Sequence, residues 1–129
     1  MGLMITLTVQ QVDDVVFDDV QAMNDELMAA GCGELYEEMT SEPDFTGPIK
    51  VVSPNEVQLA SRWDSDWNGY SDHPTMIWGC WDLSEHTIIA SHLQEGKLVL
   101  FEEVEGNDNI FWIITPGKVS RKDASDLRF

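Results

Sequence analysis

The sequence has little positive charge. Seven lysines and arginines stand against 24 aspartates and glutamates, and the formal net charge at pH 7 is −17. No lysine or arginine precedes Lys50, so residues 1–49 contain 11 acids and no base. A field of that sign repels nucleic acids and anionic membranes and attracts basic surfaces. We therefore expect no direct binding of DNA or RNA, and the charge favours a basic protein as the partner.

Cysteine and long apolar runs are also scarce. No apolar stretch approaches the roughly 18 residues that span a bilayer, and the N-terminal MGLMITLTVQQ lacks the basic region of a signal peptide. These absences predict a cytoplasmic protein without membrane association. Cys32 and Cys80 are then expected to be reduced thiols, with a single disulfide between them as the alternative.

The apolar content is sufficient for a packed core. The 129 residues are 43% hydrophobic and include five tryptophans, which argues against a disordered chain. No linker is long enough to divide the sequence, so residues 1–129 are predicted to form a single domain. Residues 118–129 contain four bases and two acids, and they are expected to form a basic, loosely ordered tail.

Residues 12–30 have the pattern of an acidic amphipathic helix. Apolar residues recur at helical spacing, and Asp14, Asp18 and Asp25 fall on the opposite side. A second helix is predicted over residues 54–63, because Ser53 and Glu56 match a capping box around Pro54. These are the two helices expected in the N-terminal half.

From residue 75 the pattern changes to short strands separated by turn signals. Residues 75–115 predict a four-stranded antiparallel meander, so the expected fold class is α+β, with this sheet packed by the two N-terminal helices. One member, residues 86–93, is assigned as a strand, with a helix as the alternative. Several strands are apolar on both faces, so a homodimer across one face is an alternative to ordinary core packing.

Residues 64–75 match part of an EF-hand calcium loop. Oxygen-bearing side chains and a glycine occupy five of its conserved positions, but Thr75 stands where a bidentate glutamate is needed. A calcium-binding module is therefore one hypothesis, and a capped turn is the alternative. Its predicted ligands are Asp64, Asp66, Asn68 and Asp72.

Trp67 and Tyr70 interleave with these acids. Aromatic residues are enriched at binding hot spots, so this pair is a candidate secondary interface. The alternative interpretation is that the two rings cover the loop.

Motifs for catalysis are lacking. The sequence contains no G-x-S-x-G, no phosphate-binding glycine loop and no H-E-x-x-H, and its histidines and cysteines lack zinc-site spacings. We therefore expect a protein that is not an enzyme and needs no cofactor apart from the hypothetical calcium.

The charge distribution favours an inhibitor that occupies a basic surface of a partner protein, such as the nucleic-acid-binding surface of a nuclease. Immunity proteins of nuclease toxins and phage anti-CRISPR inhibitors also occupy basic surfaces of their partners. This sequence resembles them in its acidic charge alone. The alternative is a non-enzymatic adaptor or oligomeric subunit whose acidity only keeps it in solution. The predicted partner-binding residues are Asp14, Asp18, Asp25, Glu34, Glu37, Glu38, Glu42 and Asp44.

Overall fold

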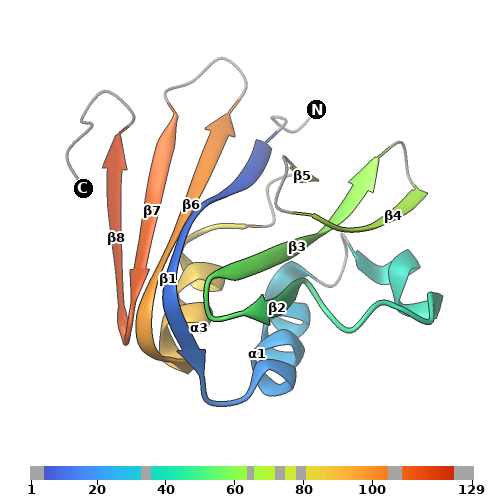
Figure 1. The fold of residues 1–129 in the computed structure, drawn as a ribbon. Helices are drawn as coiled ribbons and strands as arrows, with labels where there is room; N and C mark the ends of the chain where they lie inside the picture. The colour runs from blue at the N-terminus through green and yellow to red at the C-terminus, as the bar shows by residue number, and fades with distance from the viewer. Residues whose placement is uncertain are drawn as a thin grey trace.

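The computed structural model describes residues 5–32, 36–63, 66–71, 75–77, 81–104 and 109–123. Within these residues the chain forms two antiparallel sheets and two α-helices (Figure 1). The five-stranded sheet has the order β5-β1-β6-β7-β8, and the three-stranded sheet has the order β2-β3-β4. The predicted α+β class with an antiparallel strand meander is confirmed.

The five-stranded sheet consists of β1 (Ile5–Phe17), β5 (Thr75–Ile77), β6 (Leu93–Val104), β7 (Ile110–Thr115) and β8 (Lys118–Asp123). The three-stranded sheet consists of β2 (Ile49–Ser53), β3 (Glu56–Trp63) and β4 (Asp66–Ser71). The helical elements are α1 (Val20–Leu27), the π-helical turn η1 (Met28–Cys32), the 3-10 helix η2 (Glu37–Ser41) and α3 (Leu83–His92).

A buried core joins both sheets to both helices. Helices α1 and α3 lie side by side, with α3 against the five-stranded sheet and α1 next to β2 (Figure 1). Side chains that are fully buried include Met23 and Leu27 of α1, Leu59 of β3, Ile89 of α3 and Leu100 of β6. Burying a Leu, Ile or Met side chain stabilises a fold by about 1.5–3 kcal/mol, so this shared core holds the layers together.

The helix predicted over residues 12–30 is wrong in its first part. Residues 12–17 continue β1 and pair with β6, and α1 begins only at Val20, where Asp19 caps the helix by accepting a hydrogen bond from the Ala22 amide at 3.0 Å. The valines of this stretch are β-branched, a class that suits strands better than helices. The apolar spacing was consistent with a helix, but cross-strand pairing outweighed it.

The helix predicted over residues 54–63 is also wrong. Residues 56–63 form β3, which pairs with β2 and β4. The capping-box signal instead marks a turn, because the Ser53 hydroxyl accepts a hydrogen bond from the Asn55 amide at 3.2 Å. Serine, asparagine and proline favour tight turns for the same reasons that they favour helix starts, so the local signal does not distinguish the two.

The strand predicted over residues 86–93 is wrong as well, and the helical alternative holds. Asp82 caps α3 by accepting from the Ser84 amide at 2.8 Å, while the Glu85 carboxylate accepts from the Asp82 amide at 2.8 Å. This reciprocal capping box outweighs the strand propensity of the isoleucines that follow. Residues 118–123, predicted to begin the basic tail, form strand β8 beside β7.

Candidate functional site

The three aspartates predicted to form one row along a helix do not lie on one helix. Asp14 is in β1, Asp18 follows the end of that strand, and Asp25 is on α1. The row predicted from helical spacing is therefore wrong, because the chain is extended through residue 17. All three side chains are nevertheless exposed.

Asp14 lies in a bulge of β1 that is held from two sides. Its φ angle is +47°, and the register with β6 shifts between Asp13 and Val16. The Asp14 amide donates to Asn55 Oδ1 at 3.0 Å, and the Val15 amide donates to the Pro54 carbonyl at 2.8 Å. The tip of the β2–β3 hairpin thus fixes the bulge and keeps the Asp14 carboxylate pointing away from the core.

We expect Asp14→Gly to stabilise the fold slightly. A left-handed backbone conformation costs an L-residue roughly 1–2 kcal/mol, and glycine avoids most of that cost. Glycine also makes the unfolded chain more flexible, which offsets part of the gain in stability. The net gain should be below roughly 1 kcal/mol, measured as the free energy of unfolding in urea. A loss of stability would show that the Asp14 side chain itself supports the bulge.

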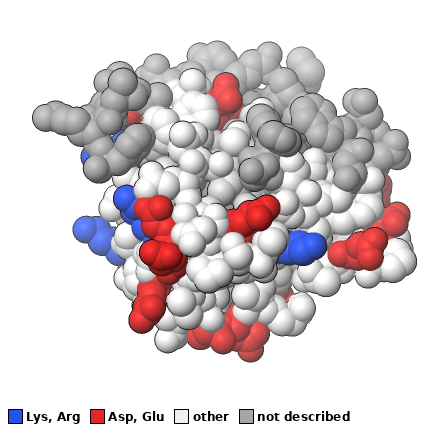
Figure 2. All heavy atoms as spheres, in the orientation of Figure 1, with Lys and Arg blue, Asp and Glu red and all other residues white. Residues whose placement is uncertain are grey.

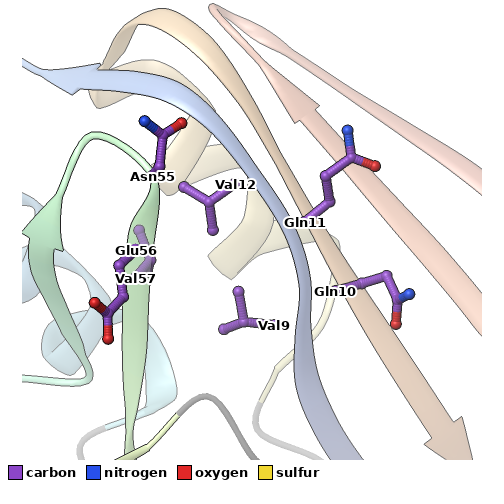
Figure 3. Close-up of a pocket in the computed structure, with 7 residues that line it drawn as sticks. All are labelled: Val9, Gln10, Gln11, Val12, Asn55, Glu56 and Val57. Carbon is purple, nitrogen blue, oxygen red and sulfur yellow. The ribbon is translucent and has the colours of Figure 1, made fainter.

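A small pocket lies beside this bulge, between β1 and the β2–β3 hairpin (Figure 3). Its volume is about 160 Å³. Val9 and Val12 extend from β1 toward β3, whereas Gln10 and Gln11 extend from the other side of the strand. Binding sites for small molecules usually measure about 300–1,000 Å³, so this pocket is small for a ligand of that kind.

His92 joins the end of β1 to α1 and α3. Its Nδ1 lies 2.7 Å from Asp18 Oδ1, and its Nε2 contacts Glu26 Oε2. Burial lowers the pKa of His92, but the hydrogen bonds to the two carboxylates outweigh that effect and raise it overall. Asp18 and Glu26 favour the protonated form of His92, and its positive charge partly neutralises the two carboxylates. Their role here is therefore structural.

A second acidic group occupies η2 and the loop after it. Glu37, Glu38, Glu42 and Asp44 are all exposed. The hydroxyls of Thr40 and Ser41 donate to the carbonyls of Glu37 and Glu38, so the short helix is closed by its own side chains and presents its carboxylates outward. Glu34, the remaining predicted partner-binding residue, lies outside the described residues.

Trp67 and Tyr70 pack over the loop that precedes β2. The Tyr70 hydroxyl accepts from the Thr46 amide at 2.9 Å and donates to the Gly47 carbonyl at 2.7 Å. The Trp67 ring meets the rings of Tyr70 and Phe45 edge to face, with centroids 5.4 and 5.6 Å apart. Both residues are half-buried, so the loop-covering role predicted as the alternative is present.

The predicted calcium segment has a different backbone from that of an EF-hand. Residues 66–71 form strand β4, and β3 stands where a helix should precede the loop. Asp64 and Asp72 lie outside the described residues, and the side chains of Asp66 and Asn68 are not among those described. No cluster of three metal-ligating side chains occurs in the described part of the chain.

Sequence reasoning missed a buried group of titratable side chains around the start of α3. His86 is fully buried between Trp81 and Trp112, with ring centroids 6.1 and 4.5 Å away. Glu85 is buried beside it, and burial together with the hydrogen bond to Asp82 raises the pKa of Glu85 to about 7. Perturbed pKa values are typical of active sites, but a substrate in solution would not reach side chains buried this deeply.

Charge on the face seen in Figure 2 is divided into groups. Acidic side chains form a column on the left, and others gather along the lower edge, where α1 lies in Figure 1, near the centre and toward the right-hand side. Lysines and arginines lie mainly on the left, where β8 runs. A partner recognised by charge on this face would therefore meet separate acidic groups.

Comparison with known proteins identifies no relative: no protein-family model, curated protein or solved structure matches the chain. Among the residues that the structure describes, the helices are too short or too polar to cross a membrane. The functional argument therefore depends on the surface of the molecule itself.

Proposed function

We propose that the protein binds a basic surface of another protein and inhibits that partner by occupying its nucleic-acid-binding site. The observation that supports this proposal is the exposure of the N-terminal acids. Residues 1–49 contain eleven acids, one of which, Glu34, lies outside the described residues, and the other ten are all exposed. A stretch without lysine or arginine thus places its carboxylates where a basic partner meets them.

Few cations oppose this acidic surface. Lys97 Nζ lies 3.8 Å from Asp13 Oδ2, and His92 pairs with Asp18 and Glu26. Asp25, Glu37 and Glu42 have no cationic partner among the described residues. Exposed carboxylates without cationic partners raise the association rate with a basic surface and make affinity depend on salt.

In the part of the chain that the structure describes, no contiguous exposed apolar patch supports the oligomeric or adaptor alternative. The exposed large hydrophobic residues in the described part of the chain are Val16, Val52 and Leu83, which lie on three different elements. Single exposed apolar side chains are normal on protein surfaces, whereas interaction sites are marked by contiguous patches. Among the described residues, the exposed acids therefore support electrostatic binding better than an apolar contact.

Affinity capture from a lysate at low salt, followed by elution with increasing salt, tests the proposal. The expected result is a partner with a basic surface whose affinity falls steeply between about 50 and 200 mM salt. An affinity that stays flat over this range would favour the adaptor and contradict electrostatic inhibition. A captured nuclease should also lose activity in proportion to the fraction bound.

Neutralising the acids around η2 should weaken binding more than neutralising acids elsewhere. The test variant replaces Glu37 and Glu42 with Gln and Asp44 with Asn, and the matched control makes the same changes at Glu95, Glu103 and Asp123, which are also exposed. Both remove three charges. We expect the test variant to lose roughly five- to thirtyfold in affinity and the control less than about threefold, because contact charges act at short range. Equal losses would mean that only net charge matters.

A further inference from the structure

A groove runs between α1 and the segment of residues 40–47. Its volume is about 340 Å³, twice that of the pocket beside the β1 bulge. The α1 side is formed by Gln21, Asp25 and Met28 at the end of the helix, and the opposite side by Thr40, Phe45 and Thr46. The groove thus lies between the acids of the α1 region and those of residues 37–44.

The floor of this groove is fixed. Asn24 is buried, and its side chain accepts from the Ile49 amide at 3.0 Å and donates to the Ile49 carbonyl at 2.9 Å. Gly47 has a φ angle of +131°, and a Cβ there would lie closer than 3.0 Å to the Asn24 side chain. Because the loop is clamped to the helix by these contacts, the groove has a defined shape before any ligand binds.

Both walls of the groove contain apolar or aromatic side chains. Met28 and Phe45 are half-buried, and the Phe45 ring is stacked on Tyr36 with centroids 5.9 Å apart and held edge-on by Trp67. An aromatic ring fixed in this way offers its surface to an alkyl chain or to a cation.

The other feature is a carboxylate at the helix side. Asp25 is exposed, and the Gln21 amide donates to Asp25 Oδ1 at 3.0 Å, which orients the carboxylate. Among the described residues, no lysine or arginine lines the groove, and the exposed Glu42 and Asp44 belong to the segment that forms its second wall. Apolar side chains on both walls, together with an oriented carboxylate, complement a side chain with an alkyl stem and a cationic end.

We infer that this groove receives an arginine side chain from an extended basic segment of the partner. This inference rests on the proposed function and specifies where the partner binds. The arginine stem packs against Met28 and Phe45, and the guanidinium reaches Asp25. Arginine fits better than lysine because its planar cation stacks on aromatic rings and forms paired hydrogen bonds with carboxylates. The volume is at the low end of ligand sites, as one side chain requires.

Titration with acetyl-(Gly-Arg)₃-amide at about 50 mM salt, followed by ¹H–¹⁵N NMR, tests the inference. The control peptide replaces arginine with citrulline, which keeps the shape and removes the charge. We expect the arginine peptide to shift amide signals of residues 24–28 and 45–47 most strongly and the citrulline peptide to shift them little. Shifts of equal size beside every exposed carboxylate, or no shifts in these two segments, would overturn the inference.

Two substitutions sharpen the test. Asp25→Asn and Phe45→Leu should each weaken peptide binding about three- to tenfold, because each removes one of the two features of the groove. Glu103→Gln, at an exposed position on β6, is the matched control and should change the affinity less than twofold. Retained dispersion of the NMR spectrum shows that each variant is folded. Unchanged affinity in both groove variants would overturn the inference.

The two proposals fail differently. If a basic partner is captured in a salt-dependent manner but Asp25→Asn and Phe45→Leu bind it normally, the groove inference is wrong and the proposed function stands. If no basic partner is captured and the arginine peptide does not bind, both are wrong.

Discussion

Replacing Gly96 with alanine should destabilise the protein by roughly 2–5 kcal/mol. Gly96 lies in β6 opposite the Asp14 bulge and has a φ angle of +93°, a conformation that L side chains rarely adopt. A Cβ at this position would lie closer than 3.0 Å to the backbone oxygens of Asp13 and Asp14. Since these neighbours are backbone atoms of a paired strand, they cannot move aside without breaking the β1–β6 register.

Gly117→Ala is the matched control for this effect. Gly117 has a φ angle of +69°, and a Cβ there would meet no atom within 4 Å. Its substitution therefore carries only the conformational cost of roughly 1–2 kcal/mol. Urea unfolding of both variants separates the two contributions. If Gly96→Ala lowers the free energy of unfolding no more than Gly117→Ala does, the close contact between β6 and the bulge of β1 leaves room for a side chain, and the prediction is wrong.

The fold class was predictable because the C-terminal strands are strongly apolar and separated by clear turns. Residues 98–102 pair with residues 110–114 as expected, and their register is antiparallel. The errors occur where one local signal fits two structures. The segment from Val12 to Phe17 has helical spacing, but it lies in a strand because β6 pairs with it on both sides of the Asp14 bulge. That pairing partner is about 80 residues away in sequence, and a local pattern does not reveal it.

The exposure of the acids was predictable, but their arrangement was not. Carboxylates without apolar neighbours stay at the surface, which all ten described acids of residues 13–44 do. The groove beside Asp25 depends on Asn24 clamping the loop before Ile49, a contact across 25 residues. No sequence signal pointed to that pair. A buried asparagine bound to both backbone groups of one residue is recognisable only in the structure.

Two neighbouring buried residues should contribute to the pH dependence of stability with opposite signs. Burial lowers the pKa of His86 from 6.5 to about 4, and its ring nitrogens have no hydrogen-bond partner within the described part of the chain. Burial raises the pKa of Glu85 from 4.5 to about 7, with the Asp82 hydrogen bond adding to the rise. Each shift corresponds to about 3 kcal/mol.

The signs follow from the protons bound by each state. As pH falls from 6.5 to 4, His86 becomes protonated in the unfolded state but stays neutral in the folded state, so stability falls. As pH falls from 7 to 4.5, folded Glu85 takes up a proton that the unfolded state still lacks, so stability rises. The two contributions oppose each other between pH 4.5 and 6.5. In this range the two residues together should change the free energy of unfolding of the parent protein little as the pH changes.

Single substitutions should expose each contribution. Glu85→Gln preserves the capping box, since glutamine fits its third position, and it should lose about 3 kcal/mol relative to the parent protein between pH 7 and 4.5. His86→Phe removes the histidine contribution and should gain stability relative to the parent protein as pH falls from 6.5 to 4. The measurement is the free energy of unfolding in urea at half-unit pH steps. Parallel pH profiles for all three proteins would contradict the burial of both groups, whereas slopes of opposite sign show that the acid and the imidazole offset each other inside the core.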